Sequence, residues 1–156
     1  MNTIKRTAIA VFTLIIMGAC SKENVNPPVT NTDSTATYLM AGTWKLTGIK
    51  VVPGVNGNTD LSSILPECEK DNIFQFKAGN KFIFDQGAMK CDASLAQSDE
   101  GSWSYDPATK KLNYSSPVLH QYSLTITTSS AKTIVGYYMG ENGGVPNTIT
   151  GTFTLQ

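Results

Sequence analysis

The stretch from residue 73 to residue 85, IFQFKAGNKFIFD, decides the fold. Its apolar and polar residues alternate on either side of a turn at residues 78–80, as they do in two antiparallel strands. Directly opposed residues of a hairpin lie on one face of the sheet. The expected inward pairs are Phe74 with Phe84 and Phe76 with Phe82. The stretch therefore predicts a β-hairpin that has one aromatic face.

The same kind of pattern continues to the end of the chain. From residue 38 on, Thr, Val, Ile, Tyr and Phe dominate, turn-forming clusters recur, and no long stretch has the periodicity of a helix. This pattern predicts an all-β domain of eight strands. The expected strands cover residues 42–51, 72–77, 80–86, 101–106, 111–116, 119–128, 132–139 and 148–155.

Three later hairpins keep the same apolar face. The expected pairs are Trp103 with Tyr114, Tyr105 with Leu112, Tyr122 with Tyr138, Leu124 with Gly136, Ile126 with Ile134, Gly136 with Phe153 and Ile134 with Leu155. A meander with one continuous inner face closes most naturally as an eight-stranded up-and-down antiparallel barrel, which also removes the sheet edges. Two stacked sheets are the alternative. Pairing of strand 42–51 with strand 148–155 distinguishes the barrel from that alternative.

The N-terminus has the pattern of an export signal. Lys5 and Arg6 precede the apolar run AIAVFTLII at residues 8–16, which is shorter than the roughly 20 residues that a membrane-spanning helix needs. Residues 17–20, MGAC, resemble the lipobox of bacterial lipoproteins. This resemblance implies that Cys20 becomes the acylated N-terminus, and that its acyl chains, palmitate among them, hold the protein in the lipid bilayer.

Three parts follow one another along the chain: a signal peptide over residues 1–19, a lipidated flexible tether over 20–37, and one folded domain over 38–156. The tether contains no aromatic residue, so it cannot bury enough surface to fold. Its start, residues 21–23, is similar to the export tags of surface lipoproteins in Bacteroidetes-type bacteria. We therefore expect a bacterial outer-membrane lipoprotein that faces the periplasm or the cell surface.

The charge balance excludes a nucleic-acid-binding face. The chain has 12 Lys and Arg against 12 Asp and Glu, and loss of Lys5 and Arg6 with the signal leaves a formal charge of −2. A nucleic-acid interface requires clustered cations, and Arg6 is the only arginine in the sequence. Aromatic residues make up 9% of the chain and are spread along it, which also excludes an acidic disordered tail.

Cys68 and Cys91 lie at the open end of the first hairpin. Continuing the register of Phe74 and Phe84 outward places residue 68 opposite residue 90, one position from Cys91. In an exported protein this arrangement favours a disulfide, and closing a loop of about 23 residues contributes roughly 3 kcal/mol. Two free thiols, or a metal site that includes His120, are the alternatives.

The motif at residues 42–44, Gly-Thr-Trp, resembles the G-x-W signature of the lipocalin or calycin group. The segments CEKDNIFQF at 68–76 and GAMKCD at 87–92 are similar to the lipocalin-like domain of Bacteroidetes-type lipoproteins. The resemblance covers about residues 39–156. It implies a calycin-like barrel whose bottom is closed by Gly42 and Trp44, and a small apolar molecule as the ligand.

The inner face supplies the candidate ligand-lining residues. They are Phe74, Phe76, Phe82, Phe84, Trp103, Tyr105, Tyr114, His120, Tyr122 and Tyr138. An eight-stranded barrel encloses enough space either for side chains alone or for one small ligand, so both a filled barrel and a pocket are compatible with the pattern. The long connection at 52–71 includes the apolar run 64–66, which either covers the mouth as a lid or plugs it.

Catalytic and metal-binding patterns are weak. His120 is the only histidine, and no Gly-x-Ser-x-Gly elbow accompanies it. Residues 56–67 carry side-chain oxygens at the spacing of an EF-hand loop, but Leu61 occupies the position that requires Gly. We therefore expect no enzyme activity, no cofactor and no resident metal.

The leading hypothesis is a lipid-anchored, non-enzymatic barrel that binds a small apolar or amphipathic ligand at the cell envelope. The alternative is a filled barrel that serves as a protein-interaction module, either a protease inhibitor or an envelope assembly subunit. An interior cavity favours the first hypothesis, and a solid interior favours the second.

Overall fold

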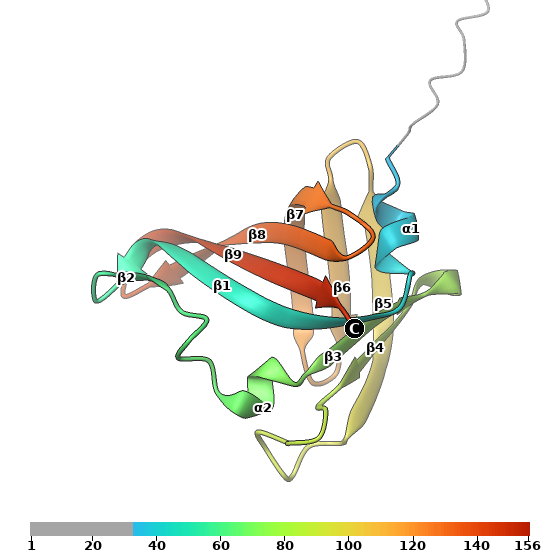
Figure 1. Cartoon of the computed structure of the whole chain (residues 1–156), viewed down its shortest axis with the longest axis horizontal. Helices are drawn as coiled ribbons and strands as arrows, with labels where there is room; N and C mark the ends of the chain where they lie inside the picture. The colour runs from blue at the N-terminus through green and yellow to red at the C-terminus, as the bar shows by residue number, and fades with distance from the viewer. Residues whose placement is uncertain (1–32) are drawn as a thin grey trace, which may run out of the picture. The chain divides into compact units, whose positions relative to one another are not determined.

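The structure, a computed structural model, describes residues 33–156 (Figure 1). These residues form two short helices, a 3-10 turn and nine strands. In chain order the elements are α1 (Thr35–Leu39), β1 (Thr43–Val55), β2 (Asn58–Asp60), α2 (Glu67–Lys70), β3 (Ile73–Lys77), η1 (Ala78–Asn80), β4 (Lys81–Asp85), β5 (Ser98–Asp106), β6 (Lys111–Ser116), β7 (His120–Ser129), β8 (Thr133–Asn142) and β9 (Val145–Leu155). The predicted signal peptide, Cys20 and most of the predicted tether lie outside the described residues.

Eight of the nine strands close into a barrel. β1 pairs with β3, each later strand pairs with the next along the chain, and β9 returns to pair with β1. The closing seam begins at the pair Trp44–Leu155 and ends at the pair Val52–Thr148. This seam distinguishes a barrel from two stacked sheets, and the prediction of an eight-stranded up-and-down antiparallel barrel is confirmed. The short β2 forms a hairpin with the far end of β1.

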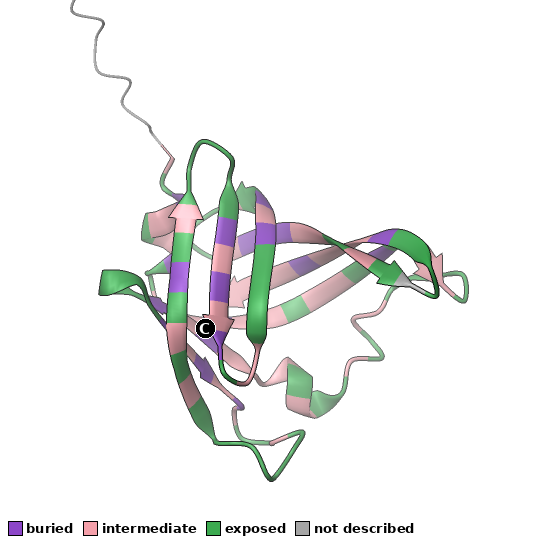
Figure 2. Cartoon of the chain, turned by 180° about the vertical axis from the view of Figure 1, so that it is seen from behind, coloured by how far each residue is buried: buried purple, intermediate pink, exposed green. Residues whose placement is uncertain are grey.

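Alternation along the strands places one set of side chains inside the barrel. Figure 2 shows buried residues alternating with exposed ones along the strands. The β3–β4 and β5–β6 hairpins have the registers that the sequence predicts. The observed pairs are Phe74–Phe84, Phe76–Phe82, Trp103–Tyr114 and Tyr105–Leu112. A strand register that keeps the apolar face inward is strongly favoured, because a slip of one residue would expose that whole face.

The β7–β8 register differs from the prediction by two residues. Ile126 lies opposite Gly136 and not opposite Ile134. The turn lies one residue later than expected, between Ser129 and Thr133, and the backbone N–H of Ser130 donates to the carbonyl of Thr133 at 2.9 Å. A register shift between Ile126 and Thr128 marks a β-bulge, and the extra residue returns Ile126 to the inner face.

The β8–β9 register also differs by two residues from the prediction. Gly136 lies opposite Gly151, and Ile134 lies opposite Phe153. The connecting turn is shorter than expected, and it consists of Gly143 and Gly144 with φ of 60° and 80°. Two successive residues with positive φ make the tight turn that suits the twist of a hairpin. A shift of two residues leaves the inner face unchanged.

The connection between the first strand and the first hairpin has more structure than the sequence predicts. β1 continues to Val55, and the turn at Asn56 and Gly57 leads into β2. The helix α2 follows and ends just before β3. The sequence signal for these elements is weak, because the polar residues of 56–60 resemble a loop and a four-residue helix leaves no periodicity.

The end of the barrel next to α1 is closed by Trp44. Its side chain is fully buried, and its indole Nε1–H donates to the carbonyl oxygen of Leu39 at 2.9 Å. Gly42 lies directly before β1 and close to the side chain of Leu155. The Leu39 carbonyl is at a helix end, where backbone groups need partners from outside the helix. The indole therefore ties α1 across the bottom of the barrel.

The folded domain begins earlier than composition suggests. The side chain of Thr35 is buried, and its Oγ1 lies 2.7 Å from the Oγ of Ser129. The hydroxyl of Tyr105 donates to the Oδ2 of Asp33 at 2.6 Å. Residues 33–37, which the sequence analysis assigned to the tether, are held to the barrel by these tertiary contacts, and composition alone does not encode such contacts.

Cys68 and Cys91 form the predicted disulfide. Their sulfur atoms lie 1.95 Å apart, and their Cα atoms lie 5.2 Å apart. The bond joins α2 to the loop between β4 and β5. Within residues 33–156, none of the helices combines the length and the hydropathy that crossing a bilayer requires.

Candidate functional site

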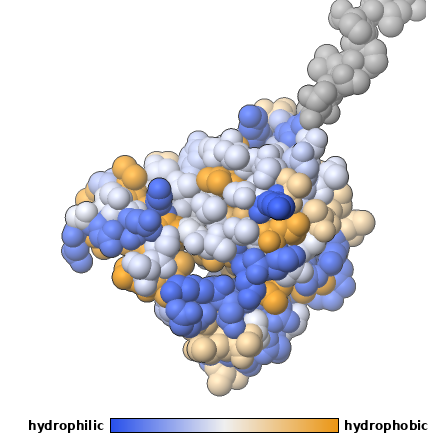
Figure 3. Space-filling model, in the orientation of Figure 1, coloured by the Kyte–Doolittle hydropathy of each residue, from blue (hydrophilic) through white to orange (hydrophobic). Residues whose placement is uncertain are grey.

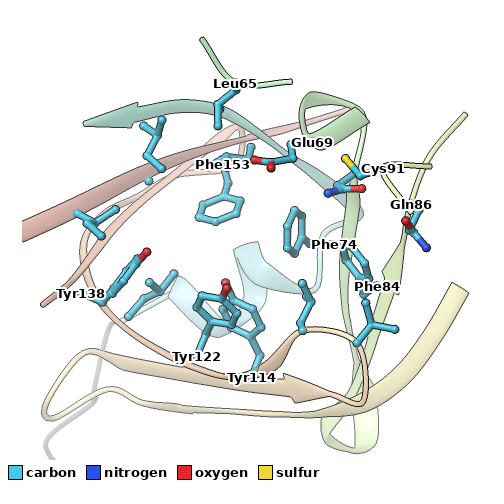
Figure 4. A pocket seen from close by; sticks show the side chains of 18 of the residues that line it. Leu65, Glu69, Phe74, Phe84, Gln86, Cys91, Tyr114, Tyr122, Tyr138 and Phe153 are labelled. Atoms are coloured by element: carbon cyan, nitrogen blue, oxygen red, sulfur yellow. The ribbon is translucent and has the colours of Figure 1, made fainter. Parts of the chain in front are cut away.

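A cavity of about 410 Å³ occupies the end of the barrel opposite Trp44 (Figure 4). Its floor is formed by Tyr114, Leu124 and Phe153, which also contact the smaller void above Trp44 and Leu39. The barrel is therefore filled in its lower half and open in its upper half. A volume of this size lies within the range of common small-molecule sites.

The walls of the cavity are largely aromatic and aliphatic. The apolar lining residues are Leu46, Ile49, Leu65, Phe74, Phe84, Leu95, Val118, Leu119, Leu124, Ile149 and Phe153. The ring of Phe74 contacts the rings of Phe84 and Phe153, at centroid distances of 5.6 and 5.4 Å. These contacts fix the rings through edge and tilted packing, so the apolar wall is formed before any ligand enters.

Three tyrosines form a polar strip on one side of the cavity, across from Glu69 and Leu65 (Figure 4). The rings of Tyr114 and Tyr122 are stacked at 5.5 Å, and the ring of Tyr138 meets Tyr122 edge-on at 6.2 Å. They come from three consecutive strands, β6, β7 and β8. The strip brings hydroxyl groups to a cavity that is otherwise mainly apolar.

The pKa values of two of these tyrosines, Tyr114 and Tyr138, are raised. Burial raises the pKa of Tyr114 well above its usual value of 10.0, and the nearby Tyr122 and Tyr138 raise it further. Burial also raises the pKa of Tyr138, with a smaller contribution from Tyr122. A neutral phenol can both donate and accept a hydrogen bond. The strip can therefore bind either a donor or an acceptor on a ligand.

Two loops that are joined by the disulfide border the mouth. The segment that ends in α2 supplies Leu65 and Glu69, and the loop between β4 and β5 supplies Cys91 and Leu95. From its sequence, the run 64–66 could be either a lid or a plug. Leu65 lines the cavity but does not fill it, whereas Ile64 is two-thirds exposed.

A second contact holds the same two loops together. The Oδ2 of Asp71 accepts a hydrogen bond from the backbone N–H of Met89 at 2.8 Å. Gly87 has a φ of 67°, and a Cβ at this position would lie 2.4 Å from the carbonyl oxygen of Asp71. Only glycine allows the loops to approach this closely. The mouth is therefore built from a fixed pair of loops.

Five of the ten candidate ligand-lining residues line the cavity. They are Phe74, Phe84, Tyr114, Tyr122 and Tyr138. Phe76, Phe82 and Trp103 face inward as expected but are packed in the core cluster. They lie next to the turn η1 at the closed end, and the indole of Trp103 donates to the carbonyl of Lys77. Alternation gives the face of a residue but not its height along the barrel axis.

The remaining two candidates lie away from the cavity. Tyr105 binds Asp33 at the closed end. His120 is exposed at the first position of β7, where its φ is 56°. His120 was expected among the ligand-lining residues because it has the same parity as Tyr122 on the inner face. The left-handed backbone conformation of His120 breaks the alternation at that position.

Sequence reasoning missed several lining residues, among them Leu46 and Ile49 on β1. These two differ in parity, so simple alternation would place them on opposite faces. A register shift between Leu46 and Gly48 marks a bulge, which brings both side chains inside. The glycine at residue 48 was the one available signal. Val118 and Leu119, in the turn before β7, had no periodic signal.

The loop with EF-hand-like spacing is a hairpin. Oδ1 of Asn58 accepts from the N–H of Asp60, and Oδ1 of Asp60 accepts from the N–H of Ser62, both at 3.0 Å. These side-chain oxygens therefore accept hydrogen bonds from backbone N–H groups of their own segment. Among residues 33–156, no three His, Cys, Asp or Glu side chains are placed to hold a metal ion.

The sequence and the structure are similar to those of known proteins. The model of the family described as "Lipocalin-like domain" matches residues 40–136, more than half of the chain. A search of curated protein sequences gave no match. The solved structures of similar shape include apocrustacyanin C2, with 12% identity and a TM-score of 0.48 over 77% of this chain and 62% of that chain.

Two further solved structures are similar to this chain. Lobster apocrustacyanin A1 has 12% identity and a TM-score of 0.47 over 76% of this chain and 61% of its own. Bovine odorant binding protein, in complex with a selenium-containing odorant, has 15% identity and a TM-score of 0.42 over 76% and 72%. The chain spans about 62% of the length of the first of these structures. By the match of the family model, this chain belongs to the family of lipocalin-like domains.

Proposed function

We propose that this protein is a lipid-anchored, non-enzymatic binding protein that holds one small, largely apolar or amphipathic molecule in the upper half of its barrel. The cavity of about 410 Å³ is the observation that carries the proposal. The aromatic rings of its wall are packed against one another, so the wall does not have to rearrange before a ligand binds. A preformed apolar cavity binds ligand at a low cost in conformational ordering.

The alternative of a filled barrel that acts as a protein-interaction module has less support. Core side chains fill the half of the interior around Trp44, and the other half is open. A purely structural barrel would gain roughly 25 cal/mol for each Å² of apolar surface that larger side chains could bury there. The open half is therefore better explained by a ligand than by stability.

The proposal places the protein at the outer membrane, facing the periplasm or the cell surface. The support comes from the lipobox-like residues 17–20 and from the pairing of the other two cysteines in a disulfide. The mature protein would be held by acyl chains on Cys20, and more than one chain is needed for stable anchoring. The barrel would then present its mouth to molecules in the envelope.

Native mass spectrometry tests the binding function. The protein is extracted gently from membranes of the cells that produce it, and the intact mass is compared before and after collisional activation. We expect a fraction of the protein to carry one small molecule that is released on activation. Protein that carries no such molecule, and that fails to take one up from a total lipid extract of the same cells, would contradict the proposal.

A further inference from the structure

The charges around the cavity indicate which ligands it prefers. Of the described residues that line it, Glu69 is the one with a formal charge at neutral pH. Figure 4 shows its carboxylate turned over the cavity, near the rings of Phe153 and Phe74. A ligand that enters the cavity therefore comes close to the negatively charged carboxylate of Glu69.

The lysines beside the mouth do not neutralise this charge. The Nζ of Lys70, the next residue in α2, is paired with Glu67 at 2.7 Å. The Nζ of Lys90, next to Cys91, donates to the carbonyl of Ala93 at 3.1 Å and to that of Leu95. The two ion pairs found among residues 33–156, Lys70–Glu67 and Lys81–Glu100, leave Glu69 out.

The other polar groups at the cavity are compatible with a ligand that donates hydrogen bonds. The hydroxyl oxygens of Tyr114, Tyr122 and Tyr138 can accept a hydrogen bond. No lysine, arginine or histidine is among the described lining residues, so a carboxylate would have no cationic partner there.

We propose that the cavity selects amphiphiles with a cationic or hydrogen-bond-donating head, such as primary amines, over carboxylate amphiphiles of the same chain length, and that Glu69 is the residue that decides. This inference rests on the proposed function, because it assumes that the cavity binds an apolar chain. The apolar wall would hold the chain, and the head would remain at the mouth beside Glu69.

Displacement of a neutral fluorescent probe tests the selectivity. The protein is loaded with N-phenyl-1-naphthylamine, and the probe is displaced at pH 7 by octylamine, octanol or octanoate, which share one chain length. We expect octylamine to compete better than octanoate by about fivefold, the upper end of what a partly exposed ion pair supplies, with octanol between them. The preference should shrink as salt is raised, because salt screens the attraction.

Two variants on α2 identify the responsible charge. Glu69→Gln keeps the shape of the side chain and should make the three competitors nearly equal. Glu67→Gln removes the same charge from the same helix, but Glu67 is paired with Lys70 and is not among the lining residues. This control should keep the wild-type preference.

The outcomes separate the two proposals. If the probe binds and octanoate competes as well as octylamine, the selectivity is contradicted and the binding function stands. If Glu67→Gln abolishes the preference as fully as Glu69→Gln, the charge acts from the surface of α2, whose outer residues are hydrophilic (Figure 3), and not from the cavity. If the probe does not bind at all, the proposed function itself fails.

Discussion

Trp44 shows how a single residue closes one end of the barrel. Its indole ring fills the space beneath the core, and its N–H satisfies a carbonyl at the end of α1. We expect Trp44→Phe to lower the free energy of unfolding by about 2–4 kcal/mol, because the change loses both buried volume and a buried hydrogen bond. Urea unfolding followed by circular dichroism measures this loss.

Trp103→Phe is the matched control for Trp44. The Trp103 indole also donates to a backbone carbonyl, that of Lys77, but Lys77 is exposed, and water can replace the lost donor. We expect a smaller loss than for Trp44. If Trp44→Phe is as stable as the wild type, Trp44 does not have the closing role assigned to it.

The tyrosine strip predicts how stability responds to alkaline pH. The pKa of Tyr114 is raised above 10.0 in the folded state, chiefly by burial, so the folded protein holds this proton more tightly than the unfolded chain. Below pH 10 both states are neutral, and the stabilising contribution is complete. As the pH rises above 10, the unfolded state ionises first, and the free energy of unfolding falls.

Urea unfolding at pH 8 and pH 11 measures this effect. Tyr114→Phe should show a smaller fall than the wild type, because the phenylalanine cannot ionise in either state. Tyr137→Phe changes a tyrosine whose neighbours along β8 face inward, so Tyr137 itself faces outward, and this control should keep the wild-type fall. Equal falls in all three proteins would contradict the assignment to Tyr114.

At the scale of single residues, the sequence predicted which side chains face the barrel interior better than it predicted their positions along the barrel axis. Phe74 and Phe76 differ by two positions on one strand and have the same inward parity. The structure places Phe74 on the cavity wall and Phe76 in the core beneath it. Parity depends only on local backbone geometry. Height relative to the cavity depends on strand tilt and on the turn at each end, which a local pattern does not contain.

The disulfide between α2 and the β4–β5 loop joins the two elements that form the mouth. We expect the double substitution of Cys68 and Cys91 by serine to lower the free energy of unfolding by roughly 3 kcal/mol, as loop closure over a separation of 23 residues implies. Hydrogen exchange should rise in α2 and in residues 86–97, and stay unchanged around Trp44. A variant as stable and as protected as the wild type would contradict this role.

At the scale of elements, the errors of sequence prediction occur at turns and bulges. The register of the β3–β4 hairpin was predicted, because four phenylalanines and a short turn determine it. The β7–β8 register was not, because Ser129-Ser130-Ala131 and the observed turn one residue later have similar turn chemistry. Because of the bulge in β1, strict alternation could assign only one of Leu46 and Ile49 to the inner face. The position of a bulge depends on how the strands close into a barrel, and closure is a property of the whole sheet.

At the scale of the whole molecule, the proposal joins the barrel to a membrane through Cys20. We expect Cys20→Ser to abolish incorporation of labelled palmitate and to move the protein out of the membrane fraction of producing cells. Cys68→Ser is the control, because Cys68 lies in α2, where it is paired with Cys91, and its loss should not affect labelling. Full labelling of the Cys20 variant would contradict the anchor.

The family and the architecture were predictable from the sequence, and the state of the interior was not. The meander, its closure and the disulfide follow from parity, from the removal of sheet edges and from the cysteine positions. Whether the aromatic residues fill the barrel depends on how side chains from eight strands divide the available volume. The division is uneven: the half around Trp44 is packed, and the half beneath Leu65 and Glu69 is open.

Binding of a ligand in the cavity can be tested by titrating a probe into a cavity-filling variant. Ile149→Trp adds a large side chain to the cavity wall, and Thr150→Trp adds the same side chain to the next position on β9, which faces outward. N-phenyl-1-naphthylamine is titrated into the wild type and both variants, after unfolding curves confirm that all three are folded.

We predict saturable binding of one probe per chain to the wild type and to Thr150→Trp, with affinity for Ile149→Trp at least about tenfold weaker, a difference near 1.4 kcal/mol. Absence of saturable binding to the folded wild type, or equal affinity in Ile149→Trp, would contradict the claim that the interior of the barrel is a binding site.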